Sequence, residues 1–149
     1  MSTIKGKKRV LFLCTGNSCR SQMAEALLRE ISGNDFDASS AGINPSRVNP
    51  IAIRVMSEIG IDMTGQRSKS INVMRGQRFD YVITVCDNAR AACPVFGPAQ
   101  EQLHWSFDDP AQATGTEDQC LAVFRKVRDS IAERVKEFAS KRIQASRLS

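Results

Sequence analysis

The sequence has no long hydrophobic run and few aromatic residues. Its 149 residues include one tryptophan, one tyrosine and one histidine, and the longest uninterrupted apolar run is the five residues 10–14. A membrane-spanning helix needs about 20 apolar residues, and a secretion signal needs about 7 to 15. We therefore expect no membrane partner and no export, and we expect the protein to work in the reducing cytoplasm.

The basic residues are also not spread evenly along the chain. The net charge is +5, but residues 1–9 and 141–149 hold seven Lys and Arg residues and no acid. Without these ends, acids outnumber bases, and no basic stripe is interleaved with aromatic side chains. This pattern argues against a nucleic-acid-binding surface. We expect one monomeric domain over residues 1–149, with flexible tails at 1–8 and 141–149.

The apolar pattern predicts strands that alternate with helices. The four predicted strands are short and mostly apolar, and they cover residues 10–14, 36–41, 79–85 and 103–105. The predicted helices carry apolar residues at helical spacing and cover 21–31, 51–59 and a long segment after the capping box of Thr116 and Gln119. Such alternation favours an α/β fold, here a single three-layer domain with a central four-stranded parallel sheet. Functional residues are then expected at the carboxyl ends of the strands.

A loop of small residues joins the first strand to the first helix, between Cys14 and Arg20. The backbone N–H groups of such a loop converge, and with the helix N-terminus they form a site for a tetrahedral oxyanion. Arg20 adds a planar donor that stays charged. The same positive field favours the Cys14 thiolate, so we expect a lowered pKa and a nucleophile aimed at the anion. The predicted anion-binding residues are Thr15, Gly16, Asn17, Ser18, Cys19, Arg20 and Ser21.

Asp109, directly before Pro110, is the candidate general acid. A carboxyl in that role protonates the leaving oxygen of the anion that the nucleophile attacks. Asp before Pro is also common in ordinary turns, so the assignment depends on the loop at Cys14.

Five cysteines in a chain without an export signal favour reactive or buried thiols over structural disulfides. Cys86 ends the third predicted strand, and Cys93 follows in a segment of polar and small residues. Cys19 and Cys120 are expected to be packed and inert. The cysteine spacings are loose for zinc, and Arg20 would oppose a cation, so we expect no metal site and no cofactor.

The Cys-x5-Arg-Ser loop and Asp109-Pro110 together resemble the signatures of the low-molecular-weight tyrosine phosphatase superfamily. The cysteine pair in Thr84-Val-Cys86-x6-Cys93-Pro94 resembles the arsenate reductases of that superfamily, especially those regenerated by thioredoxin. The likeness continues through residues 104–111 and covers residues 14–138. Ala111 stands where the phosphatases usually carry an aromatic residue after Asp-Pro, and this departure favours a small inorganic substrate.

The resemblance implies a low-molecular-weight phosphatase-like fold and a relay of three thiols. Cys14 attacks arsenate while Asp109 helps water to leave. Cys86 then attacks the Cys14 sulfur, arsenite departs, and Cys93 displaces Cys14. Thioredoxin reduces the Cys86–Cys93 disulfide, with glutaredoxin and glutathione as the alternative reductant. Phosphate and sulfate are expected to compete with arsenate.

Two other functions stay open. A phosphatase that hydrolyses phosphotyrosine through a Cys14 phosphoenzyme needs only Cys14, Arg20 and Asp109. A sensor would bind arsenite through its soft thiols without turning over arsenate.

The resemblance also implies a potassium ion behind the loop, near positions matching Asn17, Glu25 and Ser40, with an Asp completing the site. Lys69 stands at the position of that Asp. An ammonium there replaces the ion and pairs with Glu25, so we expect no requirement for a monovalent cation.

Overall fold

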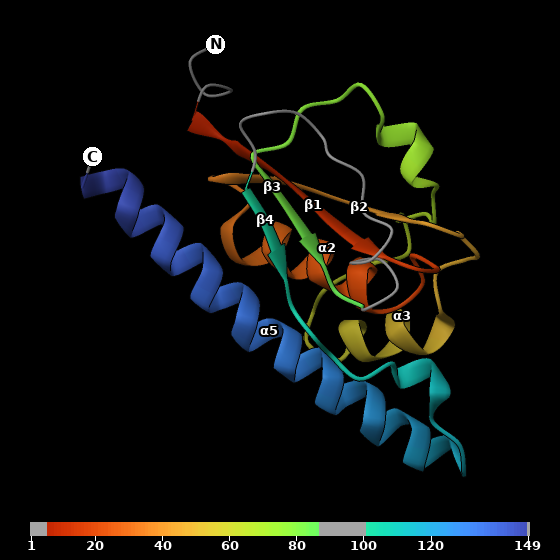
Figure 1. Ribbon diagram of the computed structural model, residues 1–149. Helices are drawn as coiled ribbons and strands as arrows, with labels where there is room; N and C mark the ends of the chain where they lie inside the picture. The colour runs from red at the N-terminus through yellow and green to blue at the C-terminus, as the bar shows by residue number, and fades with distance from the viewer. Residues whose placement is uncertain (1–5, 87–100, 149) are drawn as a thin grey trace.

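Four parallel strands form the centre of the fold (Figure 1). The computed structural model describes residues 6–86 and 101–148, and for residues 144–148 it describes the backbone alone. The strands lie in the order β2-β1-β3-β4, and each neighbouring pair is parallel. Their bounds are β1 Lys8–Cys14, β2 Phe36–Gly42, β3 Tyr81–Thr84 and β4 Glu101–His104. The prediction of an α/β domain around a four-stranded parallel sheet is confirmed.

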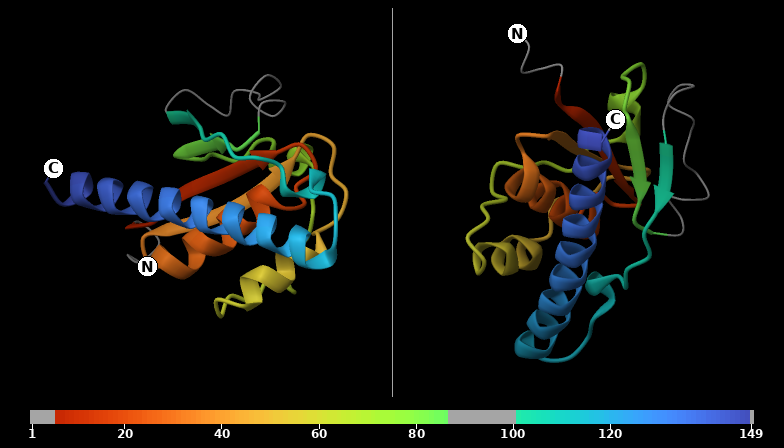
Figure 2. Two further views of the ribbon diagram at one scale, coloured as in Figure 1. Left: turned by 90° about the horizontal axis from the view of Figure 1, so that it is seen from below. Right: turned by 90° about the vertical axis from the view of Figure 1, so that its left-hand side faces the viewer.

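The described helices pack beside this sheet. Their bounds are α2 Arg20–Ser32, α3 Pro50–Ser57 and α5 Glu117–Leu148, with short 3-10 helices η1 Ile71–Met74 and η2 Pro110–Gln112. The long helix α5 contacts both α2 and α3, and Figure 2 shows it running along the sheet next to α2. Within the described residues, no helix is both long enough and apolar enough to cross a bilayer.

Helix α5 begins where the capping box predicts. The Thr116 amide donates to Gln119 Oε1 over 2.8 Å, and the Gln119 amide donates to Thr116 Oγ1 over 3.1 Å. Each side chain therefore satisfies an amide that the first turn leaves without a helical partner.

The far end of α5 differs from the prediction of a flexible tail at residues 141–149. The helix continues to Leu148 because no Gly or Pro interrupts it and because Arg142 is anchored. The Arg142 guanidinium pairs with Glu101 over 3.0 Å and lies 5.3 Å from the ring centroid of Tyr81. At the other end of the chain, Lys8 belongs to β1 rather than to a tail.

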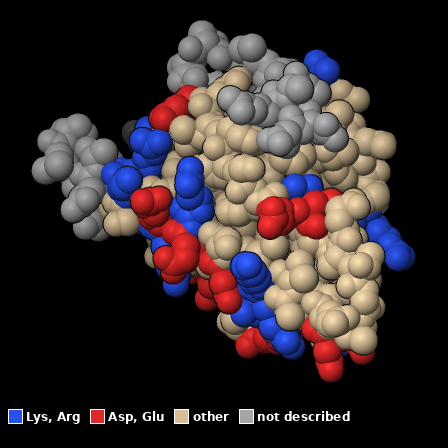
Figure 3. Space-filling view, turned by 60° about the horizontal axis from the view of Figure 1, so that its bottom comes forward, with Lys and Arg blue, Asp and Glu red and all other residues tan. Residues whose placement is uncertain are grey.

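Residues of α5 close the hydrophobic core from one side. Phe138 packs edge-on against Tyr81 and Trp105, with centroid distances of 5.1 and 5.7 Å. Arg128 is buried and donates to the Val55 carbonyl over 2.8 Å, which ties α5 to α3. On the exposed side of these helices, acidic and basic side chains are intermixed (Figure 3). These contacts hold α5 against α3 and against the aromatic rings of Tyr81 and Trp105.

The carboxyl ends of β1 and β3 lie next to each other. Leu13 pairs with Thr84 in the parallel register, so Cys14 and Cys86 follow adjacent strands. Side chains at the ends of neighbouring parallel strands share one edge of the sheet. The sheet therefore brings two cysteines together that are 72 positions apart in the sequence.

Candidate active site

The loop between β1 and α2 has its carbonyl groups turned outward. Each carbonyl oxygen of residues 14–18 accepts at least one hydrogen bond of 2.8 to 3.1 Å. In the order of these five residues, the donors are the Ile43 amide, the Asn44 amide, the Ser46 amide together with the Ser68 hydroxyl, the Gln22 side-chain amide and the Asn49 amide. In a trans peptide the N–H of the next residue points away from the carbonyl. The N–H groups of residues 15–19 therefore face the interior of the loop, where they form a nest for an oxyanion.

Asn17 holds the bend of this loop. Its φ is 49°, a left-handed conformation that Asn tolerates better than most residues. Its buried amide group donates to Ser21 Oγ and to Ser40 Oγ, each over 2.9 Å. Its side-chain oxygen accepts from the Lys69 amide over 2.9 Å. The predicted loop residues Asn17 and Ser21 are thus brought together, and Ser40 joins them from β2.

Gly42, at the end of β2, is a residue that the sequence analysis did not assign to the site. A Cβ atom at this position would lie 2.7 Å from the Thr15 carbonyl oxygen and 2.9 Å from the Asn17 amide nitrogen. The loop can pass this close to β2 only because Gly42 has no side chain. In the sequence, Gly42 has the position of a glycine that ends a strand, and no motif there predicts its contact with the loop.

Cys14 and Cys86 lie side by side at the carboxyl ends of β1 and β3, and hydrogen bonding from Cys86 acts on the Cys14 thiol. Both residues are buried, with 4% and 7% of their surface exposed. The Thr15 hydroxyl lies 3.3 Å from the Cys86 sulfur and fixes its orientation. The structure therefore places the predicted nucleophile and one of the predicted redox thiols in contact.

The predicted lowering of the Cys14 pKa is wrong for this arrangement. The hydrogen bond with Cys86 raises the pKa of the Cys14 thiol, and burial raises it further. Arg20 and the Asn17 N–H lower the pKa, as expected, but they do not outweigh the first two causes. The prediction considered only the positive field of the loop, whereas a buried neighbouring thiol opposes the charging of the first.

Arg20, the first residue of α2, connects the loop to the candidate acid. One of its terminal nitrogens donates to the Phe107 carbonyl over 3.1 Å, and the other lies 3.6 Å from a carboxylate oxygen of Asp109. Its Nε is buried and has no hydrogen-bond partner among the described residues. Asp109 in turn caps η2 by accepting from the Ala111 amide over 3.0 Å. Arg20 and Asp109, which were predicted from two separate motifs, therefore meet at one place.

The remaining cysteines have different surroundings. Cys19 is buried, and burial raises its pKa to about 11, so its thiol is protonated at neutral pH. Cys120 is half-buried rather than buried, and its thiol donates to the Ala113 carbonyl over 3.7 Å. Cys93 lies outside the described residues, so its role stays a prediction.

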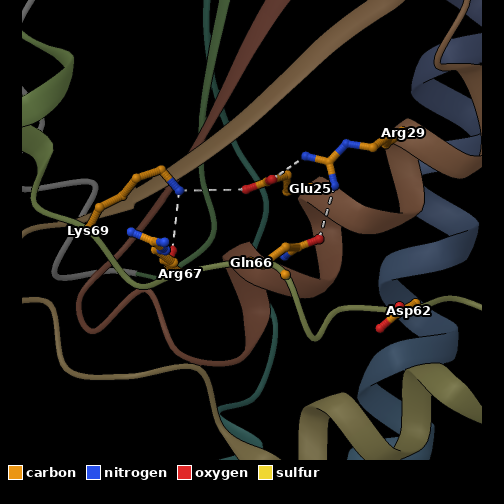
Figure 4. A pocket seen from close by; sticks show the side chains of 7 residues that line it. Glu25, Arg29, Asp62, Gln66, Arg67 and Lys69 are labelled. Carbon is orange, nitrogen blue, oxygen red and sulfur yellow. Dashed lines mark hydrogen bonds and ion pairs between the residues drawn. The ribbon is translucent and has the colours of Figure 1, made fainter.

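Behind the loop, a pocket of about 470 Å³ surrounds Glu25 (Figure 4). The Lys69 ammonium lies 4.0 Å from Glu25 Oε1 and donates to the Arg67 carbonyl over 3.3 Å. A potassium ion held by Asn17, Glu25 and Ser40 would be next to this ammonium. Because the two positive charges would repel each other, these residues do not fit a potassium ion. Nor does any group of three His, Cys, Asp or Glu side chains in residues 6–86 and 101–148 have the geometry of a metal site.

Comparisons with known proteins show a family and related sequences. The family model described as low molecular weight phosphotyrosine protein phosphatase matches residues 9–148. An arsenate reductase of Halalkalibacterium halodurans is 50% identical over 133 residues, which are 89% of this chain and 96% of that protein.

Solved structures of both kinds of enzyme have the same fold. A structure titled as an arsenate reductase in the phosphate binding state has a TM-score of 0.73 at 37% identity, covering 90% of this chain and 98% of that chain. A low molecular weight protein tyrosine phosphatase from T. tengcongensis has a TM-score of 0.70 at 26% identity, covering 91% and 99%.

Proposed function

The chain belongs to the low molecular weight phosphotyrosine protein phosphatase family, and from this premise we propose that it reduces arsenate to arsenite. The observation that carries the proposal is the placement of Cys86 beside Cys14 at the ends of adjacent strands, where both residues are buried and the Thr15 hydroxyl lies 3.3 Å from the Cys86 sulfur. A phosphatase needs a nucleophile, an anion clamp and an acid, and water completes its reaction. A second thiol in contact with the nucleophile adds what a reduction needs, which is a sulfur able to form a disulfide.

The first step is a condensation in the loop. The inward N–H groups and Arg20 hold the oxyanion, and Arg20 also lowers the pKa of Cys14 against the opposing effects of Cys86 and burial. The Cys14 sulfur forms a bond to arsenic while one arsenic–oxygen bond breaks. The thiol proton leaves with that oxygen as water, with Asp109 as the group that delivers it.

The second step moves two electrons from sulfur to arsenic. The Cys86 sulfur attacks the Cys14 sulfur, so a sulfur–sulfur bond forms and the sulfur–arsenic bond breaks. Its electron pair stays on arsenic, which changes from As(V) to As(III) and departs as arsenite, and the proton of the Cys86 thiol goes to an arsenite oxygen. Each sulfur is oxidised by one electron. Phosphate is held in the same loop but does not follow this route, because sulfur does not readily reduce phosphorus.

Regeneration requires a third thiol and an external dithiol. Cys93 attacks Cys86 in the Cys14–Cys86 disulfide, which frees Cys14 and forms a Cys86–Cys93 disulfide. A dithiol protein of the thioredoxin type then reduces this bond by thiol exchange. Glutaredoxin with glutathione is the alternative reductant. We also propose that the protein is a monomer that acts in the cytoplasm. Sedimentation of the purified protein tests its oligomeric state, and fractionation of cells tests its location.

The test is the replacement of Cys86 by serine. The Cys86→Ser variant should bind phosphate but lose arsenate-dependent oxidation of NADPH in an assay coupled to thioredoxin and thioredoxin reductase. Cys120→Ser, which removes a thiol remote from the loop, should keep the activity. A Cys86→Ser variant that turns over arsenate normally would overturn the proposal. Hydrolysis of phosphotyrosine at equal rates by both variants, with no arsenate reduction by the native protein, would favour the phosphatase.

A further inference from the structure

Lys69 lies behind the anion loop, where its backbone contacts Asn17 and its ammonium faces Glu25. We propose that Lys69 is a positioning residue, whose ammonium acts as a built-in cation that keeps the anion loop in its binding conformation. The proposal rests on the proposed function only in taking the loop to be an oxyanion site, and not on any redox step.

A chain of buried hydrogen bonds connects Glu25 to the loop. The Ser40 hydroxyl donates to Glu25 Oε1 over 2.6 Å, and it accepts from the Asn17 amide group over 2.9 Å. Asn17 is the residue with the left-handed backbone at the bend. A displacement of the Glu25 carboxylate is therefore passed through Ser40 to the bend of the loop.

Lys69 is attached to the same structure at three points. Its amide donates to Asn17 Oδ1 over 2.9 Å, and its carbonyl accepts from the Gly42 amide over 2.8 Å. Its ammonium, seen in Figure 4 pointing toward Glu25, lies 4.0 Å from Oε1. The backbone of Lys69 thus holds the loop directly, while its side chain acts on the loop through Glu25 and Ser40.

Glu25 needs a positive neighbour because its side chain is only 7% exposed. An unpaired buried carboxylate is unfavourable, and its negative field would also repel an anion bound on the far side of the loop. Two cations face it. Arg29 pairs with Oε2 and its side chain is 52% exposed, whereas the Lys69 side chain is 30% exposed and faces Oε1.

The two cations therefore have different effects on the loop. Oε1 is the oxygen that accepts from Ser40, so its position is coupled to Asn17. Oε2 faces Arg29, which belongs to the same helix and also donates to Gln66 Oε1 over 3.1 Å. Removal of Lys69 should loosen the loop, whereas removal of Arg29 should leave the Oε1 contacts intact.

The pocket around Glu25 makes the proposal testable with small cations. Arg67, Gln66 and Asp62 also line this pocket, which opens to solvent. In the Lys69→Ala variant, the space vacated by the side chain lies next to Glu25 Oε1. A potassium ion from solution can then take over the role of the ammonium.

The experiment measures binding of inorganic phosphate by calorimetry, in either tetramethylammonium chloride or potassium chloride at equal ionic strength. In tetramethylammonium chloride, Lys69→Ala should bind phosphate about tenfold more weakly than the native protein. This expected loss lies between the small loss from removing an exposed ion pair and the larger loss from removing a buried one, because the Lys69–Glu25 pair is partly buried. Potassium should restore most of this affinity. The native protein should bind equally well in both salts.

Arg29→Ala is the matched control, because it removes one positive charge from the same carboxylate. Its phosphate affinity should change by less than about twofold and should not depend on potassium. If Lys69→Ala fails to fold, Lys69→Met, which keeps the length of the side chain, replaces it. Unchanged affinity in the Lys69 variant, a loss that potassium does not reverse, or strong potassium activation of the native protein would each overturn the proposal. Since phosphate binding needs no thiol relay, these outcomes are independent of the Cys86→Ser result.

Discussion

The close approach of the anion loop to Gly42 leads to a sharp prediction for Gly42→Ala. The added methyl group would lie 2.7 Å from the Thr15 carbonyl oxygen, whereas ordinary contacts begin at about 3.4 Å. The loop must therefore move by about 0.7 Å. It cannot do so by turning a flexible side chain, because the nearest atoms are two backbone atoms and the Asn17 Cβ, which moves only with its backbone. We expect the free energy of unfolding to fall by about 1 to 3 kcal/mol, as in other overpacked sites.

The larger effect should be on the chemistry. A misplacement of reacting groups by about 1 Å can lower activity by about a hundredfold, so a shift of this size should lower kcat/KM for arsenate by roughly 10- to 100-fold. The assay is the coupled oxidation of NADPH, with phosphate affinity measured by calorimetry and unfolding by urea. Gly65→Ala is the control, because a Cβ atom there meets nothing within 4 Å and its φ is not positive. A Gly42→Ala variant with native stability and native phosphate affinity would refute the reasoning.

Two further predictions concern the charged groups. Hydrogen bonding to Arg125 lowers the pKa of Glu58 to about 2. The interaction of ionised Glu58 with Arg125 therefore stabilises the fold fully above the ordinary pKa of 4.5, and this stabilisation is lost as the pH falls toward 2. Acid unfolding followed by circular dichroism should show a weaker pH dependence between 4.5 and 2 in Glu58→Gln, and an unchanged dependence would contradict this. Arg20→Lys should bind phosphate at least about tenfold more weakly, because an ammonium lacks the paired donors of a guanidinium. If calorimetry shows near-native phosphate affinity in Arg20→Lys, the proposal that the Arg20 guanidinium binds the anion is wrong.

Local patterns were sufficient for much of the fold. The apolar run before Cys14 predicted a buried central strand, and Thr116 with Gln119 predicted the start of α5, because strand periodicity and helix capping depend on residues close in sequence. The continuation of α5 to Leu148 was not predicted, for the same reason in reverse. Arg142 is held by Glu101 and Tyr81, which are distant in sequence, so composition alone made the segment look like a solvated tail.

The sequence by itself determined which groups are present at the site: a cysteine and an arginine that bracket a loop of small residues, a carboxyl before proline and further cysteines. Those identities follow from covalent order and short-range geometry. The tertiary structure decided how they act on one another. It placed Cys86 against Cys14 and thereby raised the pKa that the loop alone would lower, and it brought Gly42 to the back of the loop. Such hydrogen bonds and close packing join segments that are distant in the sequence, so no local pattern of residues predicts them.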